Sequence, residues 1–354
     1  MKILLLAGEQ SGELYAAKIR DRLAGHEIRG YGDYGFSTGD LAVMGFWPVI
    51  KRLPFFLRVA RTMKRAIDEW KPDAVCTIDY PGMNLKLAAY AKSRGVKTVH
   101  VVCPQVWAWK KGRIPKIEAS VHRLCCFFPF EPAYFKPGFA QFVGHPLKDE
   151  FAGLRRNREA SAGERLLAVL PGSRTGEIEK ILPVLMGALR RLGGVSACIP
   201  AANPKARKAI EKVAAEYPDV KIEVIDGGAR RLLLAADCAV VASGTATLEA
   251  ALAGCPTVLV YRVGRLLGWF ARMVIKGISH VGLANIIAEK SGVECPMPEL
   301  LQDDFTEEAV VSHLKPWLEN DAECREAAEK LRRTMELLKS DGDAIGKIAA
   351  LIEH

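Results

Sequence analysis

This chain of 354 residues lacks cysteine motifs, long apolar runs and an excess of acidic residues. Its nine cysteines form no Cys-x-x-Cys pair and no Cys/His cluster, which excludes the common zinc motifs and a disulfide framework. We therefore expect reduced, buried thiols, as in a cytoplasmic protein, and no metal. No run approaches the roughly 18 apolar residues of a membrane span, which predicts a soluble or peripheral protein. The apolar start turns polar at Glu9 and is typical of a buried first strand rather than a signal peptide.

What the chain does have is apolar content and positive charge. Hydrophobic residues make up 49% of it, enough for two packed cores, and at this length two domains are expected. The formal net charge of +9 suits a phosphorylated substrate, anionic lipid or nucleic acid. No nucleic-acid-binding motif is present, which disfavours the last of these.

Apolar, strand-like runs alternate with helical patterns along most of the sequence, and this order predicts parallel sheets covered by helices on both faces. A polar, arginine-rich stretch at 148–165 interrupts the alternation and is expected to be the linker. We expect a fold of two Rossmann-like, doubly wound domains that face a cleft, as in GT-B glycosyltransferases. The expected boundaries are 1–150, 165–320 and, for closing helices, 321–354.

Two glycine-containing segments, Leu170–Arg174 and Ser243–Glu249, each follow an apolar strand and begin a helical pattern. The first N–H groups of a helix have no backbone partner, and a glycine lets a phosphate approach them closely. Each junction alone is common in α/β proteins. Glu249, one turn into its helix, could bind ribose hydroxyls, and the guanidinium fork of Arg174 suits a diphosphate. Together the two segments predict a sugar-nucleotide site.

Other polar segments follow predicted strands in the first half. Asp79 comes after the strand at 74–78 and precedes a proline, so its carboxylate is a candidate general base, or else a turn cap. Ser11-Gly12 begins a helix and could bind a second phosphate, unless the serine is a plain N-cap. Trp107 could line a sugar or acyl surface, although burial is the commoner state of such rings. These strand ends predict the acceptor site, and its candidate residues are Glu9, Ser11, Gly12, Gln105 and Trp107.

A basic amphipathic helix is expected from Pro54, because six basic residues and no acid lie between Pro48 and Ile67. Such a helix can lie on an anionic membrane, or it can be an ordinary domain helix with a solvated basic face. A second basic, aromatic stretch at 262–276 favours the membrane. The residues expected to contact it are Phe56, Arg58, Arg61, Met63 and Arg65.

Two tempting motifs are excluded by context. Asp341-Gly342-Asp343 resembles the acidic triplet of metal-dependent sugar transferases, but it lies between helical patterns and is expected to cap a helix. Gly172-Ser173-Arg174 lacks the Gly-x-Ser-x-Gly elbow of serine hydrolases.

Taken together and in order, the motifs of this chain resemble those of lipid-A-disaccharide synthases nearly end to end. The matching segments are Ala7-Gly8-Glu9, Ser11-Gly12, Leu41 to Gly45, Ile78-Asp79 with Pro81 and Asn84, Pro104 to Trp109, Pro129-Phe130-Glu131, Phe142 to Leu147, Leu170 to Arg174, Ser243 to Glu249, Asn285, and Glu299 to Gln302. Gly82 stands where many members have a second acid, which leaves Asp79 as the candidate base.

The resemblance implies a GT-B enzyme that transfers 2,3-diacylglucosamine from its UDP ester to 2,3-diacylglucosamine 1-phosphate and forms a β-1,6-linked disaccharide. It also implies a peripheral cytoplasmic enzyme at the inner membrane. From the residues themselves, we expect an anionic membrane surface as a partner and no cofactor, metal or nucleic acid. By position, Asp79 would be the base. The residues implied for UDP are Gly172, Ser173, Arg174, Ser243, Gly244, Thr245, Ala246, Thr247, Glu249, Asn285 and Gln302.

Two alternatives stay open from the sequence. Another GT-B enzyme, such as a UDP-N-acetylglucosamine transferase or 2-epimerase, would share the donor half. A non-catalytic relative that binds lipid would bind vesicles but not UDP.

Overall fold

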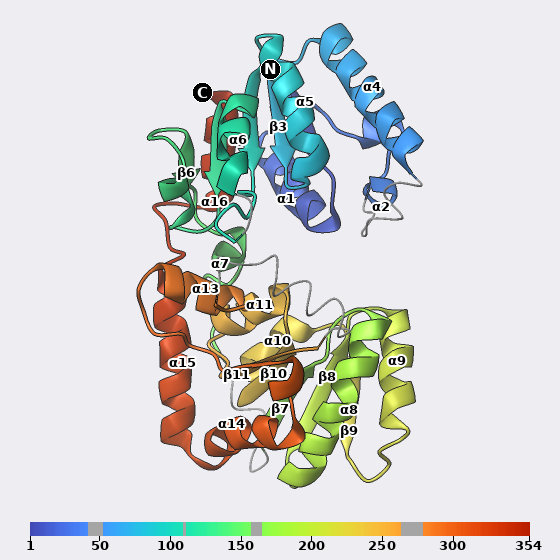
Figure 1. Cartoon of the computed structure of the whole chain (residues 1–354), viewed down its shortest axis with the longest axis vertical. Coiled ribbons are helices and arrows are strands. Elements are labelled where there is room, and N and C mark those ends of the chain that lie inside the picture. The colour runs from blue at the N-terminus through green and yellow to red at the C-terminus, as the bar shows by residue number, and fades with distance from the viewer. Residues whose placement is uncertain (42–51, 109–110, 157–164, 263–278) are drawn as a thin grey trace. The chain divides into compact units, whose positions relative to one another are not determined.

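The computed structural model describes residues 1–41, 52–108, 111–156, 165–262 and 279–354. The chain divides into two compact units (Figure 1). Unit 1 comprises Met1–Asp149 together with Leu338–His354, and unit 2 comprises Glu150–Leu337.

The core of unit 1 is a six-stranded parallel sheet in the order β2-β1-β3-β4-β5-β6. Its central strands are almost wholly buried, as parallel strands covered on both faces must be, and β1 and β3 are largely apolar. The strands are β1 (Lys2–Ala7), β2 (Glu27–Arg29), β3 (Ala74–Ile78), β4 (Lys97–Val101), β5 (Arg123–Cys126) and β6 (Ala140–Phe142).

Alternate residues of β1 supply the cores on the two faces of this sheet. Ile3 and Leu5 pack with residues of α1 (Gln10–Arg22) and α16 (Ala344–Glu353). Leu4 and Leu6 pack instead with residues of α4 (Leu53–Trp70) and α5 (Pro81–Ser93). The remaining helices are α2 (Thr38–Leu41), α6 (Ile114–Ser120) and α7 (Pro146–Glu150), the last of which crosses the boundary between the units.

Unit 2 repeats this plan around a parallel sheet in the order β12-β11-β10-β7-β8-β9. Helices α8, α9 and α14 contribute to the core on one face, and α10 and α11 contribute to the core on the other. The strands are β7 (Leu166–Leu170), β8 (Ser196–Ala201), β9 (Ile222–Asp226), β10 (Cys238–Ala242), β11 (Thr257–Tyr261) and β12 (Glu299–Leu301). The helices are α8 (Thr175–Leu192), α9 (Pro204–Ala214), α10 (Ala229–Ala235), α11 (Thr245–Leu252), α13 (Leu283–Lys290), α14 (Glu307–Glu319) and α15 (Asp321–Glu336).

The strand orders place a topological switch point in each sheet. In unit 2, chain order runs outward from β7 in one direction and from β10 in the other, so these neighbours form the switch point. In unit 1 the corresponding neighbours are β1 and β3. Ligands of open α/β sheets bind beyond the carboxyl ends of the strands at such points.

The helices expected together at 321–354 divide between the units. Helix α15 belongs to unit 2, whereas α16 belongs to unit 1, because Ile348 and Ile352 of α16 fill the core beside β1. The aspartate before α16 is a helix cap, as expected: the Asp343 carboxylate accepts the Gly346 N–H at 2.6 Å.

Among the described residues, no helix is both long and apolar enough to cross a bilayer. All nine cysteines are free thiols, and all but Cys295 are buried. The two parallel sheets with helices on both faces confirm the expected pair of Rossmann-like units.

Candidate functional site

A cavity of about 390 Å³ lies at the switch point of unit 2. Its wall is formed by the segments that follow β7 and β10, together with the ends of β8 and β9. Eight of the eleven residues expected to bind UDP line it: Gly172, Ser173, Arg174, Ser243, Gly244, Thr245, Ala246 and Glu249. The other lining residues are Leu170, Glu177, Pro200, Ala202, Gly227, Ala229 and Ala242.

Two helices begin at this cavity without a side-chain cap. The N-cap residue of α8 is Arg174, whose side chain has no acceptor, and that of α11 is Gly244, which has no side chain, so neither helix receives a side-chain cap. The uncapped N–H groups and the positive ends of both helix dipoles suit an anion. Gly172 has φ +110°, and a Cβ there would come within 2.8 Å of the Glu177 carboxylate, so a side chain at this turn would be both strained and crowded.

Charged side chains sit around these helix starts. Arg174 donates from Nη1 to Glu177 Oε1 at 2.9 Å, and its side chain is 64% exposed, so the guanidinium remains accessible to a ligand. Glu249 accepts from Arg230 Nη2 at 3.3 Å, and Arg230 also pairs with Glu150 at 2.8 Å. The pairing with Arg230 orients the Glu249 carboxylate at the cavity wall, one turn into α11.

Three of the residues expected to bind UDP do not line the cavity. Thr247 is fully buried, and its Oγ1 donates to the Gly244 carbonyl at 2.8 Å, which secures the first turn of α11. Asn285 is also fully buried: its Nδ2 donates to the Met297 carbonyl and to Glu299. Gln302 accepts from the Arg262 guanidinium through its backbone carbonyl at 3.2 Å. The sequence placed these residues in ligand motifs, but it does not distinguish a loop-supporting side chain from one that faces a ligand.

The lining residues Pro200, Ala202, Gly227 and Ala229 were not predicted. They lie at or beyond the carboxyl ends of β8 and β9. Because their side chains have no charged or hydroxyl group, only their position at a strand end could have identified them as lining residues.

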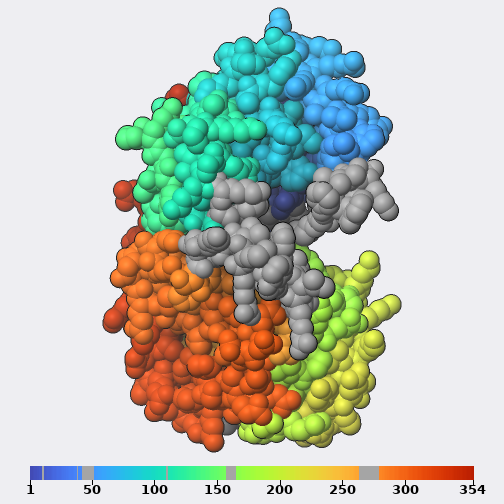
Figure 2. All heavy atoms as spheres, in the orientation of Figure 1, coloured from blue at the N-terminus to red at the C-terminus, as the bar shows by residue number. Residues whose placement is uncertain are grey.

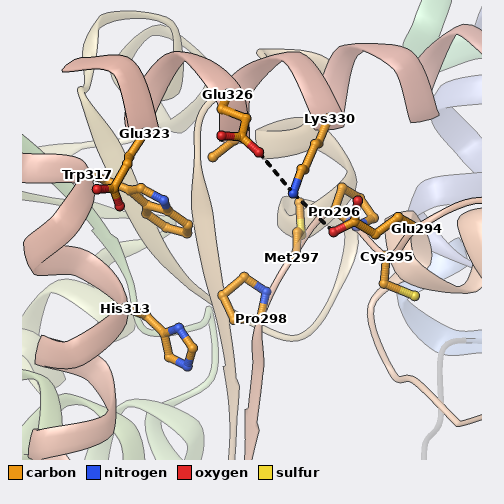
Figure 3. Close-up of a pocket in the computed structure, with 11 residues that line it drawn as sticks. Glu294, Cys295, Pro296, Met297, Pro298, His313, Trp317, Glu323, Glu326 and Lys330 are labelled. Carbon is orange, nitrogen blue, oxygen red and sulfur yellow. Dashed lines mark hydrogen bonds and ion pairs between the residues drawn. The ribbon is translucent and has the colours of Figure 1, made fainter. Parts of the chain in front are cut away.

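A second cavity of unit 2, of about 380 Å³, has a different character (Figure 3). It is lined by α14, α15 and residues 294–298, with His313 and Trp317 on one helix. Lys330 already pairs with Glu294 at 3.0 Å and with Glu326 at 3.3 Å, as the dashed lines show. Because acidic groups surround its only lysine, this cavity suits a diphosphate less well than the first.

The switch point of unit 1 carries two carboxylates. Glu9 follows β1 and is the N-cap residue of α1, and Asp79 follows the adjacent strand β3. Burial raises the pKa of Asp79, and the hydrogen bond from the Tyr80 N–H offsets part of this rise. Burial, and then the charge of Asp79, raises the pKa of Glu9. Such raised pKa values are typical of carboxylates that take part in proton transfer.

The turn that presents Asp79 is unusual. Asp79 and Tyr80 have φ values of +49° and +50°, a conformation that costs roughly 1–3 kcal/mol for each non-glycine residue. The buried Asn84 holds the turn by donating to the Asp79 carbonyl at 2.8 Å and the Ile78 carbonyl at 3.0 Å, while Tyr31 donates to its Oδ1 at 2.8 Å. Sequence reasoning quoted Asn84 as part of a motif but assigned it no role; the structure shows that it supports Asp79.

The other candidates for the acceptor site differ in their exposure to solvent. Gln105 follows β4 and is exposed, and Gly12 lies in the first turn of α1. The side chain of Ser11 and all of Trp109 lie outside the described residues. Trp107 is a correction, because it is only 2% exposed and donates from Nε1 to Glu131 at 3.1 Å, so it has no free surface for a sugar or an acyl chain.

Glu131 is the centre of a buried polar cluster that sequence reasoning missed. Its carboxylate also accepts the Phe127 and Phe128 N–H groups, each at 3.1 Å. Ligand atoms of Cys103, Cys126 and Glu131 lie within 4.8 Å of one another. Cys103 follows β4, whereas Cys126 ends β5 and Glu131 lies shortly after it, so spacing along the sequence could not bring Cys103 together with the other two. The hydrogen bonds make this cluster a structural link between the segments that follow β4 and β5.

This cluster should make stability depend on pH. Burial raises the pKa of Glu131 to about 7 despite its hydrogen bonds. Between the ordinary pKa of about 4.5 and this raised value, the Glu131 carboxyl keeps its proton in the folded state and loses it in the unfolded state. The free energy of unfolding that Glu131 contributes therefore falls as pH rises from about 4.5 to 7, by about 3 kcal/mol in all. Denaturant unfolding over this range should show that slope in the wild type and a flatter one in Glu131→Gln. Equal slopes would contradict the assignment.

Helix α4 corrects two of the predicted membrane contacts. Phe56 is 8% exposed and Met63 is fully buried, because the apolar face of the helix packs on the sheet. Arg58, Arg61 and Arg65 are exposed, as expected of a basic outer face. Figure 2 shows the residues of α4 at the surface of unit 1. Nearly all of the second basic stretch, at 262–276, lies outside the described residues.

Solved structures with similar folds include MurG and a UDP-GlcNAc 2-epimerase. MurG of Acinetobacter baumannii has a TM-score of 0.63 at 16% identity, covering 99% of each chain. UDP-GlcNAc 2-epimerase of Neisseria meningitidis, solved with UDP-GlcNAc bound, has a TM-score of 0.62 at 12% identity and covers 100% of each chain. At these identities the likeness shows the fold alone, and it confirms the GT-B class.

Sequence relatives are far closer. The family model for lipid-A-disaccharide synthetase matches residues 3–350. The lipid-A-disaccharide synthase of Chromohalobacter salexigens is 37% identical over an alignment covering 93% of this chain and 90% of the relative. That of Alcanivorax borkumensis is 34% identical, covering 99% and 96%. The chain therefore belongs to the lipid-A-disaccharide synthase family.

Proposed function

We propose that this protein is an inverting glycosyltransferase that joins UDP-2,3-diacylglucosamine to 2,3-diacylglucosamine 1-phosphate, giving the β-1,6-linked lipid A disaccharide 1-phosphate and UDP. Family membership supports the reaction. The observation that carries the donor site is the cavity of unit 2, where two uncapped helices begin at the switch point of a parallel sheet.

In this proposal the diphosphate of the donor lies against the first N–H groups of α8 and α11. Arg174 binds it from the rim, and Glu249 accepts the ribose hydroxyls. As the glycosidic bond breaks, negative charge grows on the leaving UDP. Fixed amides and a guanidinium stabilise that charge without having to reorganise.

Asp79 is proposed as the general base. Its raised pKa gives it more affinity for a proton than an ordinary carboxylate has, as suits a general base. It takes the proton of the acceptor C6 hydroxyl, and the oxygen attacks the anomeric carbon from the face opposite UDP. The α bond of the donor is thereby replaced by a β bond in the product.

The basic face of α4 is proposed to bring unit 1 to the inner membrane. Arg58, Arg61 and Arg65 are exposed, and Leu57 beside them is 47% exposed. Cationic side chains near an anionic bilayer contribute about 1 kcal/mol each. Both diacylated substrates reside in that bilayer, so the contact would place the enzyme at its substrates.

Neutralising this face should weaken membrane binding. In sedimentation assays, the triple variant Arg58→Gln, Arg61→Gln, Arg65→Gln is expected to have an affinity for anionic vesicles about 100-fold lower than that of the wild type, because three such contacts are lost. Activity on detergent-dispersed substrates should change little. Equal sedimentation of the two proteins would mean that the basic face is merely solvated.

The reaction itself is tested by mass spectrometry of products formed from the UDP donor and the 1-phosphate acceptor. The proposal predicts a tetra-acylated disaccharide monophosphate together with UDP. Turnover of only non-acylated UDP-sugars would instead favour a transferase or epimerase of the kind represented among the similar structures.

A further inference from the structure

A cationic cavity lies at the edge of the unit 1 sheet opposite the switch point. It has a volume of about 410 Å³ and is lined by residues next to the amino ends of β5 and β6, by the end of α5, and by α6. Four basic residues contribute to its wall: Lys92, His122, Arg123 and Lys136. None of them belongs to the donor or acceptor sites described above.

Among the residues that the structure describes, the cations of this cavity have no carboxylate partner. Within the described parts of the chain, Lys92, Arg123 and Lys136 form no salt bridge. By contrast, Arg190 and Arg207 of unit 2 pair with acids at 2.6 and 2.7 Å. Glu118, the one acid of the wall, accepts the backbone N–H of Lys136 at 2.8 Å. Lys97, which begins β4, has a buried Nζ with no hydrogen-bond partner among the described residues.

The contact of His122 with Thr98 of β4 leaves the other ring nitrogen of His122 as a hydrogen-bond donor. Its Nδ1 accepts the Thr98 N–H at 3.1 Å, so the neutral ring carries its proton on Nε2. Burial, followed by the charges of Lys92, Arg123 and Lys97, lowers the pKa of His122. Burial and the charge of Arg123 likewise lower the pKa of Lys97. The cluster is therefore under mutual repulsion that a bound anion would relieve.

We propose that this cavity binds a phosphate group, either free inorganic phosphate or the phosphomonoester of a larger ligand. A compact polyanion matches several converging cations and a ring N–H donor better than a carboxylate does. Arg123 and Lys136 are both exposed and reach it from solvent. Lys92, whose Nζ donates to the Val121 carbonyl at 2.6 Å and the Glu118 carbonyl at 3.2 Å, forms the fixed part of the wall.

Calorimetric titration with inorganic phosphate, in chloride buffer of constant ionic strength, tests the proposal. Saturating UDP is included so that phosphate does not enter the cavity of unit 2. The double variant Arg123→Gln, Lys136→Gln is expected to bind about 100-fold more weakly than the wild type, at about tenfold for each cation removed. The control Arg325→Gln, an exposed arginine on α15, should bind as the wild type does.

Thermal unfolding of the same proteins separates binding from a structural role. Phosphate should raise the melting temperature of the wild type and of Arg325→Gln but not that of the double variant. Without phosphate, the double variant should melt no lower than the wild type, because the substitutions remove repulsion between the cations. Vesicles of phosphatidylcholine with and without phosphatidic acid identify the source when the α4 residues Arg58, Arg61 and Arg65 are glutamine in every protein compared, so that the basic face of α4 does not contribute. A preference for phosphatidic acid that the double substitution abolishes indicates a lipid headgroup, and no such preference indicates free phosphate. No phosphate binding by the wild type, or equal binding by the double variant, would overturn the proposal.

Discussion

Asp79→Asn is expected to lower kcat by about three orders of magnitude while the protein stays folded. General bases typically contribute 10²- to 10⁴-fold, and asparagine keeps an oxygen that can accept the Tyr80 N–H. Because burial raises the pKa of Asp79, the acid limb of the wild-type pH profile should lie above the ordinary carboxyl range. Activity should fall as pH drops through that raised pKa.

The measurement is the pH dependence of kcat for the wild type, Asp79→Asn and the control Asp21→Asn. Asp21 lies on the exposed side of α1, so its variant should retain wild-type rates. A residual rate in Asp79→Asn that no longer depends on pH in the acid limb would identify Asp79 as the titrating group. Near wild-type turnover in this variant would remove Asp79 from the mechanism.

Arg174→Ala is expected to reduce kcat/KM by about 10²- to 10³-fold, the typical cost of losing one stabiliser of developing charge. The side chain is at the cavity rim and largely exposed, so its removal should leave the melting temperature nearly unchanged. UDP affinity measured by calorimetry should fall as well, because the guanidinium also binds the ground-state diphosphate.

Two matched variants sharpen this result. Arg325→Ala removes an exposed arginine from α15 and should change neither affinity nor rate. Arg174→Lys keeps the positive charge but loses the forked pair of guanidinium donors. Its kcat/KM and its UDP affinity should therefore lie between those of the alanine variant and the wild type. Unchanged UDP binding by Arg174→Ala would show that Arg174 points away from the nucleotide.

The larger features of the fold follow from local patterns. The strand at 74–78 was predicted with the boundaries that the structure has, because a buried parallel strand needs largely apolar residues on both faces. The edge strands β2 and β12 were not predicted: at three residues each, they are too short to carry a pattern. The assignment of α16 to unit 1 depends on long-range packing, which no local signal encodes.

The candidate site divides in the same way. Strand-to-helix junctions that contain glycine can be recognised in the sequence, and both of those predicted here line the cavity. An amphipathic pattern gives no indication of which surface its apolar face will meet, so Phe56 and Met63 were assigned to a membrane although they pack on their own sheet. Trp107 was placed at an acceptor surface because the sequence does not show that Glu131 accepts its N–H in the interior.

The most direct test of the donor site is a crystal structure of the protein with UDP. The diphosphate should lie against the N–H groups that begin α8 and α11, with Arg174 at its oxygens and Glu249 at the ribose. Nucleotide bound elsewhere, or none at saturating UDP, would contradict the account.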